Sequence, residues 1–444
     1  MKNIDTSIFR SYDIRGVYPD QLTEQIAYTA GQGIVRMVKG KKIAVGGDMR
    51  VSTPQLKEAY INGILDMGCD VDDLGLIPTD FIYFVAGTKQ YDAVTIITAS
   101  HNPKEYNGIK SVRQGNKAIY GKDYLPFMKG VLEKKPKRGK LNSVNYYDEY
   151  IKHILSFVDI SKLKPLKVVV DAGNGTAGKV MPMLAKHLPF EFVEVDYELD
   201  GNFPNRPSNP YAPGAYKKAS KIVRQEKAAC GVMFDGDSDR TFFIDEKGGF
   251  MQGDISFILM AKALLQEQPG AGIVYNAVCS RSVPECIEKF GGKAFRSKVG
   301  YINLQQAMLE HDAIASGELS AHYAFKDNFY GDGGFISMLL FLQILSQSDK
   351  PLSKLRAEYE RYYKEPETNF EIKDAQSLIE KLKQEYSDGE QDELDGLTVN
   401  YQNWWFNVRP SGTEPLVRVT VEAPNKREWK KHIKKLIKIV KASK

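Results

Sequence analysis

The sequence has few of the residues that would place it in a membrane, around zinc or in an oxidising compartment. Its 444 residues include only four cysteines, Cys69, Cys230, Cys279 and Cys286, without C-x-x-C spacing. Such scattered cysteines favour reduced thiols in a cytoplasmic protein over a disulfide framework or a zinc site. No charged-then-apolar signal region opens the chain, and its most apolar segment, 335–345, falls short of the roughly 20 residues of a membrane span. We therefore expect no membrane partner.

A general excess of positive charge is also missing. The net charge is +5, but residues 426–444 carry nine Lys or Arg against the single Glu428, so the rest of the chain is slightly acidic. This distribution argues against a nucleic-acid partner. In the basic segment, Trp429, Ile433 and Leu436 recur at helical spacing. The spacing predicts a C-terminal packing helix with a solvated basic face; a helix lying on a membrane surface is the alternative.

The length and a weak internal repeat predict several α/β domains. A chain of this length exceeds the size at which a single core keeps growing. Three segments, 43–48, 168–173 and 273–276, each run from a short apolar strand into a turn with Gly, Asp or Asn, and a helix-compatible stretch follows. Their spacing of about a hundred residues predicts three similar mixed α/β domains.

The last part of the chain differs in kind. Residues 397–400 and 417–422 look like alternating strands, which predicts a smaller α+β domain. The acidic tract 388–395 suggests a solvated hairpin or loop more than a metal site. Charged or glycine-rich stretches at 133–138 and 248–249, and a charged helix expected over 355–363, suggest the boundaries between domains. The expected domains are 1–150, 151–253, 254–366 and 367–444.

A serine stands at the end of a predicted buried strand. The apolar run 93–97 leads into Thr98-Ala99-Ser100-His101-Asn102-Pro103. Loops beyond the carboxyl ends of buried parallel strands are where open α/β sheets carry their chemistry, so Ser100 is a candidate nucleophile or carrier of a covalent group. A neighbouring histidine, His101, is poorly placed to be the base of that serine. The alternative is a plain turn in which Ser100 or Asn102 caps a helix.

Three carboxylates follow a second apolar strand, 231–234. Asp235, Asp237 and Asp239 alternate with small residues, and their oxygens can converge on one hard cation. An EF-hand is the competing assignment, because Glu246 stands twelfth from Asp235. Its sixth position, however, is Arg240 where glycine is needed, and both flanks look like strands. Magnesium suits the loop better than calcium.

Two further loops carry polar residues at the ends of predicted elements. After a strand expected over 313–315, Glu318, Ser320 and His322 alternate and suit hydrogen bonding to sugar hydroxyls; a helix-capping Ser320 is the alternative. The segment 409–415 combines an arginine, hydroxyls and a glycine, as in an anion-binding turn, and a plain turn competes. Together the four loops indicate phosphoryl transfer on a sugar phosphate.

In this order the loops resemble the α-D-phosphohexomutase family, of the phosphomannomutase/phosphoglucomutase type. The resemblance covers nearly the whole chain. The matching motifs are 9–16, 98–103 with 106–110, 235–240, 317–322 and 409–415. The resemblance implies four domains around a central cleft, each of which supplies one loop.

The resemblance also implies roles for individual residues. Ser100 would be phosphorylated, with Mg²⁺ held by its phosphate and by Asp235, Asp237 and Asp239. Lys110 and His101 would transfer protons, supported by Arg15. The lysine could have a lowered pKa among so many positive charges. The implied substrate-binding residues are Tyr12, Arg240, Lys298, Glu318, Ser320, His322, Arg409, Ser411, Gly412 and Thr413.

The expected function is a magnesium-dependent mutase of hexose phosphates. It would interconvert mannose, and also glucose, 6-phosphate and 1-phosphate through the phosphoserine and a hexose 1,6-bisphosphate, which also serves as activator. Relatives acting on glucosamine phosphate carry Gln where Leu319 stands, so a phosphoglucosamine mutase is the second choice. A non-catalytic sugar-phosphate or calcium-binding protein is the third. The sequence leaves monomer and dimer open.

Three positions depart from the family pattern. Tyr301 and Arg206 stand where histidine is frequent, and Gly47 replaces a commonly charged or bulkier residue. The consequence of Tyr301 for substrate contact or proton transfer is open.

Overall fold

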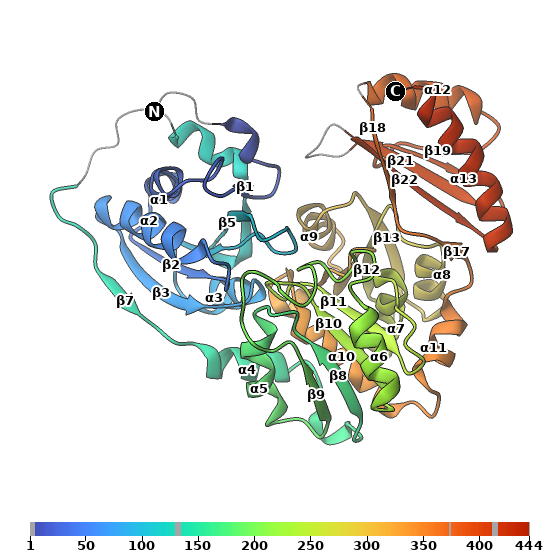
Figure 1. The fold of residues 1–444 in the computed structure, drawn as a ribbon, viewed down its shortest axis with the longest axis horizontal. Coiled ribbons are helices and arrows are strands. Elements are labelled where there is room, and N and C mark those ends of the chain that lie inside the picture. Colours follow the sequence, from blue (N-terminus) through green and yellow to red (C-terminus); the bar gives the residue numbers. More distant parts are fainter. Residues whose placement is uncertain (1–4, 129–134, 373, 411–415, 444) are drawn as a thin grey trace. The chain divides into compact units, whose positions relative to one another are not determined.

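The computed structural model describes residues 5–128, 135–372, 374–410 and 416–443. They belong to two compact units (Figure 1). Unit 1 comprises Met1–Gln252 and Ser320–Ser353, and unit 2 comprises Gly253–Leu319 and Lys354–Lys444. Within the described ranges, the search for a helix with the length and apolar character of a membrane span finds none.

The first sheet of unit 1 has the strand order β1-β5-β4-β2-β3-β7, with β6 paired to β5. The strands β2, β3, β4 and β7 run parallel, whereas β5 lies antiparallel to β4 and to β1. The strands are β1 (Ile14–Val17), β2 (Lys42–Gly47), β3 (Asp70–Leu76), β4 (Ala93–Ile97), β5 (Tyr106–Arg113), β6 (Lys117–Ile119) and β7 (Leu141–Ser143). The accompanying helices are α1 (Glu24–Val38), α2 (Thr53–Asp66), α3 (Asp80–Thr88) and the 3₁₀ turns η1 (Thr6–Ile8), η2 (Gln114–Asn116) and η3 (Gly121–Phe127).

Two glycines allow α1 and α2 to cross closely. A Cβ atom at Gly31 would lie 2.1 Å from the Tyr60 carbonyl oxygen, and one at Gly63 would lie 2.0 Å from the Tyr28 carbonyl oxygen. Both distances are below van der Waals contact, so each helix presents a bare backbone to the other. This crossing is part of the buried core over β2 and β3, with Ile43, Val71 and other apolar residues.

The second sheet of unit 1 has the order β11-β10-β8-β9. Strands β8, β9 and β10 run parallel, and β11 closes the edge antiparallel to β10. The strands of this sheet are β8 (Lys167–Asp171), β9 (Glu191–Val195), β10 (Cys230–Phe234) and β11 (Thr241–Asp245). Unit 1 also contains the antiparallel pair β15 (Tyr323–Phe325) and β16 (Gly331–Asp332), which is not part of this sheet. The helices are α4 (Tyr147–Leu155), α5 (Ala177–Ala185), α6 (Lys217–Gln225), α10 (Gly334–Gln347), and the 3₁₀ turns η4 (Ile160–Lys162) and η5 (Lys326–Asn328).

Helix α10 packs against this second sheet, although it lies far from it in the sequence. The rings of Phe341 and Phe243 stack with centroids 3.6 Å apart, and those of Phe335 and Phe234 lie 4.9 Å apart. Phe234 is the last residue of β10, so the packing fixes the strand end from which the acidic loop leaves.

Unit 2 contains a parallel three-strand layer and an antiparallel C-terminal sheet. Strand β12 lies between β13 and β14, and the C-terminal sheet has the order β17-β22-β21-β20-β19 with β18 on β22. The strands are β12 (Gly272–Asn276), β13 (Lys293–Ser297), β14 (Ala315–Gly317), β17 (Tyr363–Lys364), β18 (Thr368–Glu371), β19 (Glu390–Asp392), β20 (Leu397–Asn400), β21 (Trp405–Pro410) and β22 (Leu416–Ala423). The helices are α7 (Gly253–Glu267), α8 (Ser282–Lys289), α9 (Tyr301–Glu310), α12 (Ala375–Glu385) and α13 (Lys426–Lys441), and α11 (Leu352–Tyr359) spans the chain boundary between the units.

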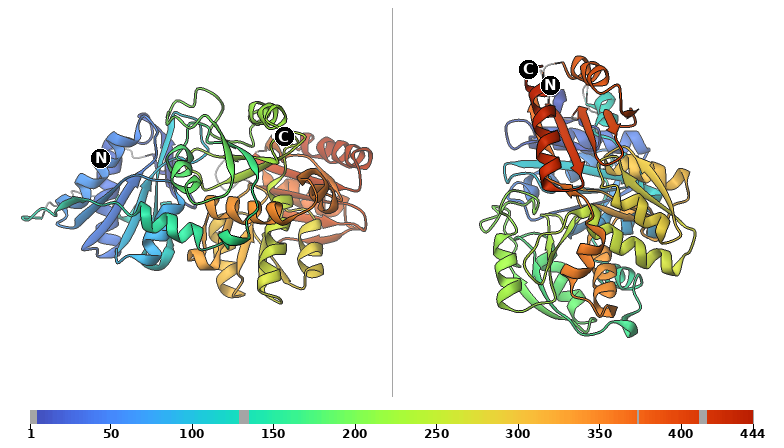
Figure 2. Two further views of the ribbon diagram at one scale, coloured as in Figure 1. Left: turned by 90° about the horizontal axis from the view of Figure 1, so that it is seen from below. Right: turned by 90° about the vertical axis from the view of Figure 1, so that its right-hand side faces the viewer.

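Much of the predicted organisation is confirmed. The three repeated segments are β2, β8 and β12, and each is a parallel strand followed by a helix. The basic helix is α13, which lies along the C-terminal sheet in both views of Figure 2 and buries Ile433, Leu436 and Val440. The packing interpretation of that helix was therefore correct.

Two local predictions were wrong in their bounds. The strand expected over 313–315 begins only at Ala315 and continues to Gly317. The charged helix expected over 355–363 is α11, which ends at Tyr359 before a short strand starts.

The acidic tract 388–395 forms the hairpin that was expected: β19 pairs antiparallel with β20, and Asp388, Glu390 and Glu393 are exposed. Two of its carboxylates also have partners, because Asp392 pairs with Arg296 and Asp395 accepts a hydrogen bond from the Val299 backbone N–H group at 2.9 Å.

Candidate active site

The Ser100 loop connects two antiparallel strands. Strand β4 ends at Ile97, the chain turns through 98–105, and β5 begins at Tyr106. No helix follows Ser100, so the helix-capping interpretation was wrong. The strand that leaves this turn carries Lys110, which pairs with Ile96 of β4.

Ser100 has an unusual backbone and a directed hydroxyl. Its φ is +49°, a left-handed conformation that is uncommon for residues other than glycine. Its Oγ donates to Asp235 Oδ2 at 2.9 Å and lies 3.3 Å from His101 Nδ1. The expectation that His101 is poorly placed was therefore wrong, because this backbone turn brings the neighbouring ring back to the hydroxyl.

The three acids of the second loop converge as the sequence predicted. Asp235, Asp237 and Asp239 are buried, and each has a carboxylate oxygen within 4.8 Å of the others. Asp237 Oδ2 accepts hydrogen bonds from Thr79 Oγ1 at 2.5 Å and Thr98 Oγ1 at 3.1 Å. The first sheet therefore holds one oxygen of Asp237 in place, although the aspartate belongs to the second.

This cluster fits a divalent cation. Within the described residues, Asp237 Oδ1 and Asp239 Oδ1 are buried without a hydrogen-bond partner, a costly arrangement unless another positive group completes it. Burial, followed by the charge of Asp239, raises the pKa of Asp235 well above its usual value and also raises that of Asp237. A hard cation with oxygen ligands would relieve both effects.

The EF-hand interpretation was wrong. The loop is flanked by the strands β10 and β11 and not by helices. The Glu246 carboxylate accepts hydrogen bonds from the Ser353 hydroxyl at 2.5 Å and its backbone N–H at 2.9 Å, and Glu246 is absent from the acidic cluster.

Lys110 and His322 face Asp239. Lys110 Nζ lies 3.4 Å from Asp239 Oδ2, and His322 Nε2 lies 3.5 Å from its Oδ1. Burial opposes ionisation of Asp239, but Lys110 and His322 outweigh burial and hold the pKa of Asp239 well below its usual range. Arg240 Nε donates to His322 Nε2 at 3.2 Å, and Ser320 Oγ lies 3.2 Å from His322 Nδ1. Ser320 precedes no helix, so its capping interpretation was also wrong.

Arg15 lies beside the Ser100 loop. It belongs to β1, where it pairs with Gly108 of β5. Its Nη1 donates to Asn102 Oδ1 at 2.9 Å, and its Nη2 pairs with Asp13. Burial, then Arg240 and Arg15, lower the pKa of His101 well below its usual value, so its imidazole is neutral at physiological pH. Tyr12 lies three residues before Arg15 and is partly exposed.

The remaining predicted site residues belong to unit 2. Glu318 is buried directly after β14 and accepts a hydrogen bond from Asn276 Nδ2 at 3.1 Å. Lys298 is exposed after β13. Arg409 lies near the end of β21, and its Nη2 donates to both carboxylate oxygens of Glu367 at 3.1 Å. Ser411, Gly412 and Thr413 lie outside the described residues.

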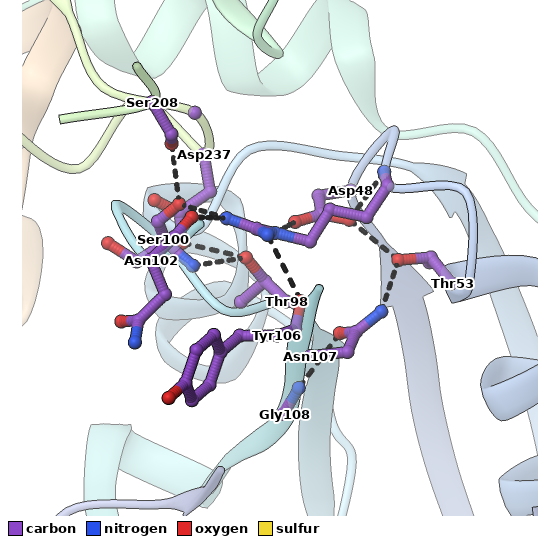
Figure 3. A network of polar contacts seen from close by, with 12 residues as sticks. Asp48, Thr53, Thr98, Ser100, Asn102, Tyr106, Asn107, Gly108, Ser208 and Asp237 are labelled. Atoms are coloured by element: carbon purple, nitrogen blue, oxygen red, sulfur yellow. Dashed lines mark hydrogen bonds and ion pairs between the residues drawn. The ribbon is translucent and has the colours of Figure 1, made fainter. Parts of the chain in front are cut away.

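Sequence reasoning missed the groups that hold the Ser100 loop. The carbonyl oxygen of Ser100 accepts hydrogen bonds from Arg50 Nη2 at 2.7 Å and from Ser208 Oγ at 2.9 Å. Figure 3 shows Ser208 and Asp48 on either side of this loop. The glycine–aspartate turn after β2 belongs to the internal repeat described above. Nothing in the sequence around Arg50, two residues after Asp48, indicates that it contacts a loop fifty residues away.

The departures from the family pattern have structural partners. Arg206 is buried, with Nε 3.0 Å from both oxygens of Asp171, and its Nη2 donates to the Phe234 carbonyl oxygen at 2.6 Å. It therefore holds the strand end from which the acidic loop leaves. A Cβ atom at Gly47 would lie 2.4 Å from Thr53 Cγ2, so a larger residue would clash. Tyr301 begins α9 in unit 2.

Sequence comparison matches the chain to four consecutive domain families. They are the phosphoglucomutase/phosphomannomutase alpha/beta/alpha domain I over residues 6–123, domain II over 148–249, domain III over 252–362 and the C-terminal domain over 367–439. Together with the observed layers, these matches confirm the predicted class of three mixed α/β domains and a smaller C-terminal domain.

Individual relatives agree over nearly the whole chain. A phosphomannomutase of Vibrio cholerae is 37% identical, covering 94% of this chain and 95% of its own. A phosphomannomutase of Methanocaldococcus jannaschii is 35% identical, with 98% of each chain covered. The crystal structure of a phosphoglucomutase/phosphomannomutase family protein from Burkholderia thailandensis superposes with a TM-score of 0.90 at 32% identity, covering 99% of this chain and 98% of the other.

Proposed function

The chain belongs to the phosphoglucomutase/phosphomannomutase family and is a sugar-phosphate mutase; from this premise we propose its substrates and chemistry. It interconverts mannose 6-phosphate and mannose 1-phosphate, and the two glucose phosphates, through phospho-Ser100 and a hexose 1,6-bisphosphate. The named phosphomannomutase relatives support mannose as substrate.

One observation carries the proposal. The Ser100 hydroxyl donates to Asp235 at 2.9 Å, inside a buried cluster of three carboxylates. A hydroxyl that only capped a turn would not need such surroundings. A hydroxyl that carries a transferable phosphoryl group beside a cation would, because the reaction concentrates negative charge at this point.

The proposed reaction consists of two phosphoryl transfers. In the first, the bond between phosphorus and Ser100 Oγ breaks as phosphorus bonds to the free hydroxyl of the hexose monophosphate. The sugar hydroxyl loses its proton and Ser100 Oγ gains one, so Ser100 ends as a hydroxyl. The product is a hexose 1,6-bisphosphate. After the bisphosphate reverses its orientation, the other phosphoryl group returns to Ser100 and releases the isomeric monophosphate.

The residues present suit a magnesium ion in this reaction. Asp235, Asp237 and Asp239 would hold it with an oxygen of the serine phosphate. When bound, it would offset charge on the transferring group. Arg240 lies with Nε 3.9 Å from Asp235 and would add a second positive charge beside the cluster.

Two groups are placed for proton transfer. Lys110 is buried with its Nζ 3.4 Å from Asp239 Oδ2, and His101 Nδ1 lies 3.3 Å from the serine oxygen. Both would exchange a proton with the attacking or leaving hydroxyl, and Arg15 would orient the loop through Asn102. In unit 2, Arg409 would grip the non-reacting phosphate with the planar guanidinium group that the Glu367 carboxylate orients. Glu318, Ser320 and His322 would read the sugar hydroxyls.

Intact-mass measurement tests the phosphoserine. Purified protein incubated with glucose 1,6-bisphosphate and Mg²⁺ should gain the mass of one phosphate, Ser100→Ala should gain none, and the exposed Ser161→Ala should behave as wild type. A Ser100→Ala protein that still gains the phosphate would overturn the assignment.

A substrate panel tests the sugar. Coupled assays with mannose, glucose and glucosamine phosphates, with bisphosphate supplied, should give the highest kcat/KM for mannose or glucose. A higher value on glucosamine phosphate would establish the alternative, a phosphoglucosamine mutase.

A further inference from the structure

We propose that Arg50 is the positioning residue that locks the Ser100 loop in its reactive shape. The proposal rests on the proposed function for what the loop does, but the lock itself concerns the loop conformation. Arg50 follows β2 in the first sheet, it is 1% exposed, and it touches none of the reacting groups named above.

The guanidinium of Arg50 collects the loop carbonyl groups. Its Nη1 donates to the carbonyl oxygens of Pro103 at 2.8 Å and Tyr106 at 3.0 Å. Its Nη2 donates to those of Ser100 and Asn102, both at 2.7 Å. Four acceptors within seven residues therefore converge on one planar group. Only the fixed fork of arginine offers that many donors in one plane, whereas lysine offers a single point charge.

Asp48 and Phe203 hold the Arg50 side chain in place. Its Nε lies 3.2 Å from Asp48 Oδ2, and its guanidinium carbon lies 5.1 Å from the centre of the Phe203 ring. Asp48 Oδ1 in turn accepts hydrogen bonds from the Arg50 backbone N–H at 2.9 Å and from Thr53 Oγ1 at 2.6 Å. The arginine therefore cannot follow the loop if the loop moves.

The same network reaches the far end of the loop. Thr53 Oγ1 accepts a hydrogen bond from Asn107 Nδ2 at 3.0 Å, and Asn107 Oδ1 accepts one from the Gly108 backbone N–H at 2.8 Å (Figure 3). Asn107 and Gly108 are the second and third residues of β5, so the turn is held at both its start and its end.

The strained backbone of Ser100 explains why such a lock is needed. A non-glycine residue at a φ of +49° persists only where its surroundings over-determine it. The peptide groups of Ser100 are held on both sides: its N–H donates to Thr98 Oγ1 at 2.9 Å, and its carbonyl accepts from Arg50 and Ser208. Without Arg50 the residue would relax, and its hydroxyl would turn away from Asp235.

Arg50→Lys tests the lock because it keeps the charge and removes the fork. We expect kcat to fall about 10²-fold while KM stays within about threefold, since small misplacement of a reacting group costs rate and not substrate binding. Backbone amide exchange over residues 98–108 should become at least about tenfold faster, whereas exchange in β8 should stay unchanged. The control Arg36→Lys, in the last turn of α1, should match wild type in all three measurements.

Asp48→Asn keeps the proposal testable if Arg50→Lys does not fold. It retains the arginine, removes the charge behind it, and should lower kcat about tenfold with KM unchanged. If amide exchange over 98–108 is unchanged in a folded variant, the proposed role of Arg50 is wrong. Amide exchange does not depend on enzyme activity, so this result can be distinguished from failure of the proposed mutase function. A lowered Tm with unchanged kcat also overturns the proposed role of Arg50.

Discussion

Replacing Asp237 by asparagine separates the role of this residue in the fold from its role in ion binding. One of its oxygens accepts hydrogen bonds from Thr79 and Thr98, and the other is buried without a hydrogen-bond partner among the described residues. Asparagine keeps an oxygen for the two threonines but turns a neutral amide nitrogen toward the cluster. The fold should survive and the cation site should not.

Asp237→Asn should affect the free energy of unfolding in opposite directions with and without the ion. Two full charges about 4 Å apart repel by about 4 kcal/mol at an effective dielectric constant of about 20. Asp237→Asn removes part of this repulsion, so the ion-free variant should be at least as stable as the ion-free wild type. Wild type with Mg²⁺ at about 100 times its Kd should gain about 2.7 kcal/mol, which corresponds to a Tm rise of about 5–10 °C. The variant should gain little.

Thermal unfolding with EDTA or Mg²⁺, paired with the coupled assay, checks both effects. Turnover of Asp237→Asn should fall about 10²-fold or more. The control Asp159→Asn, at an exposed acid elsewhere in unit 1, should keep both turnover and the Mg²⁺-induced shift. An equal Mg²⁺-induced rise in Tm in wild type and Asp237→Asn, or wild-type turnover in the variant, would refute the assignment of Asp237 as a ligand.

Two further predictions concern the stability of unit 1. Burial lowers the pKa of His153 below that of an unfolded histidine, so the unfolded chain binds more protons at acid pH. The stability that this residue contributes is therefore present above about pH 6.5 and is lost as the pH falls toward the pKa of His153 in the folded protein. Urea titrations at several pH values should show that the free energy of unfolding of His153→Gln depends less on pH than that of wild type. Gly63→Ala places a methyl group 2.0 Å from the Tyr28 carbonyl oxygen and should lower the free energy of unfolding by about 1–3 kcal/mol. Gly33→Ala, inside α1, meets its nearest atom, the Phe127 Cβ, at 3.1 Å and should cost less. Equal losses in urea unfolding would contradict the close helix crossing.

The parts of the site that could be predicted from sequence are those built from contiguous residues. Strand β10 is an uninterrupted apolar run, and its acids follow at alternating positions, so both the strand and the convergence of the acids could be expected. The same holds for β4 and Ser100. The boundaries at 150, 253 and 366 stay predictions.

The parts that could not be predicted depend on contacts between distant segments. Nothing around Arg50 or Thr79 in the sequence points to Ser100 or Asp237, because tertiary packing alone brings these residues together. Short elements were also missed at their ends. Strand β14 has only three residues, Ala315–Gly317, and its sheet neighbours decide where it starts.

Asp237 is a carboxylate with its two oxygens committed to different tasks. The hydroxyl groups of Thr79 and Thr98 fix its rotation, so it has no freedom to swing outward around a wider ion. Selectivity between ions of different radius depends largely on ligand flexibility, and a rigid ligand disfavours the larger ion. At the proposed cation site, the rotation fixed by Thr79 and Thr98 would therefore favour Mg²⁺ over Ca²⁺.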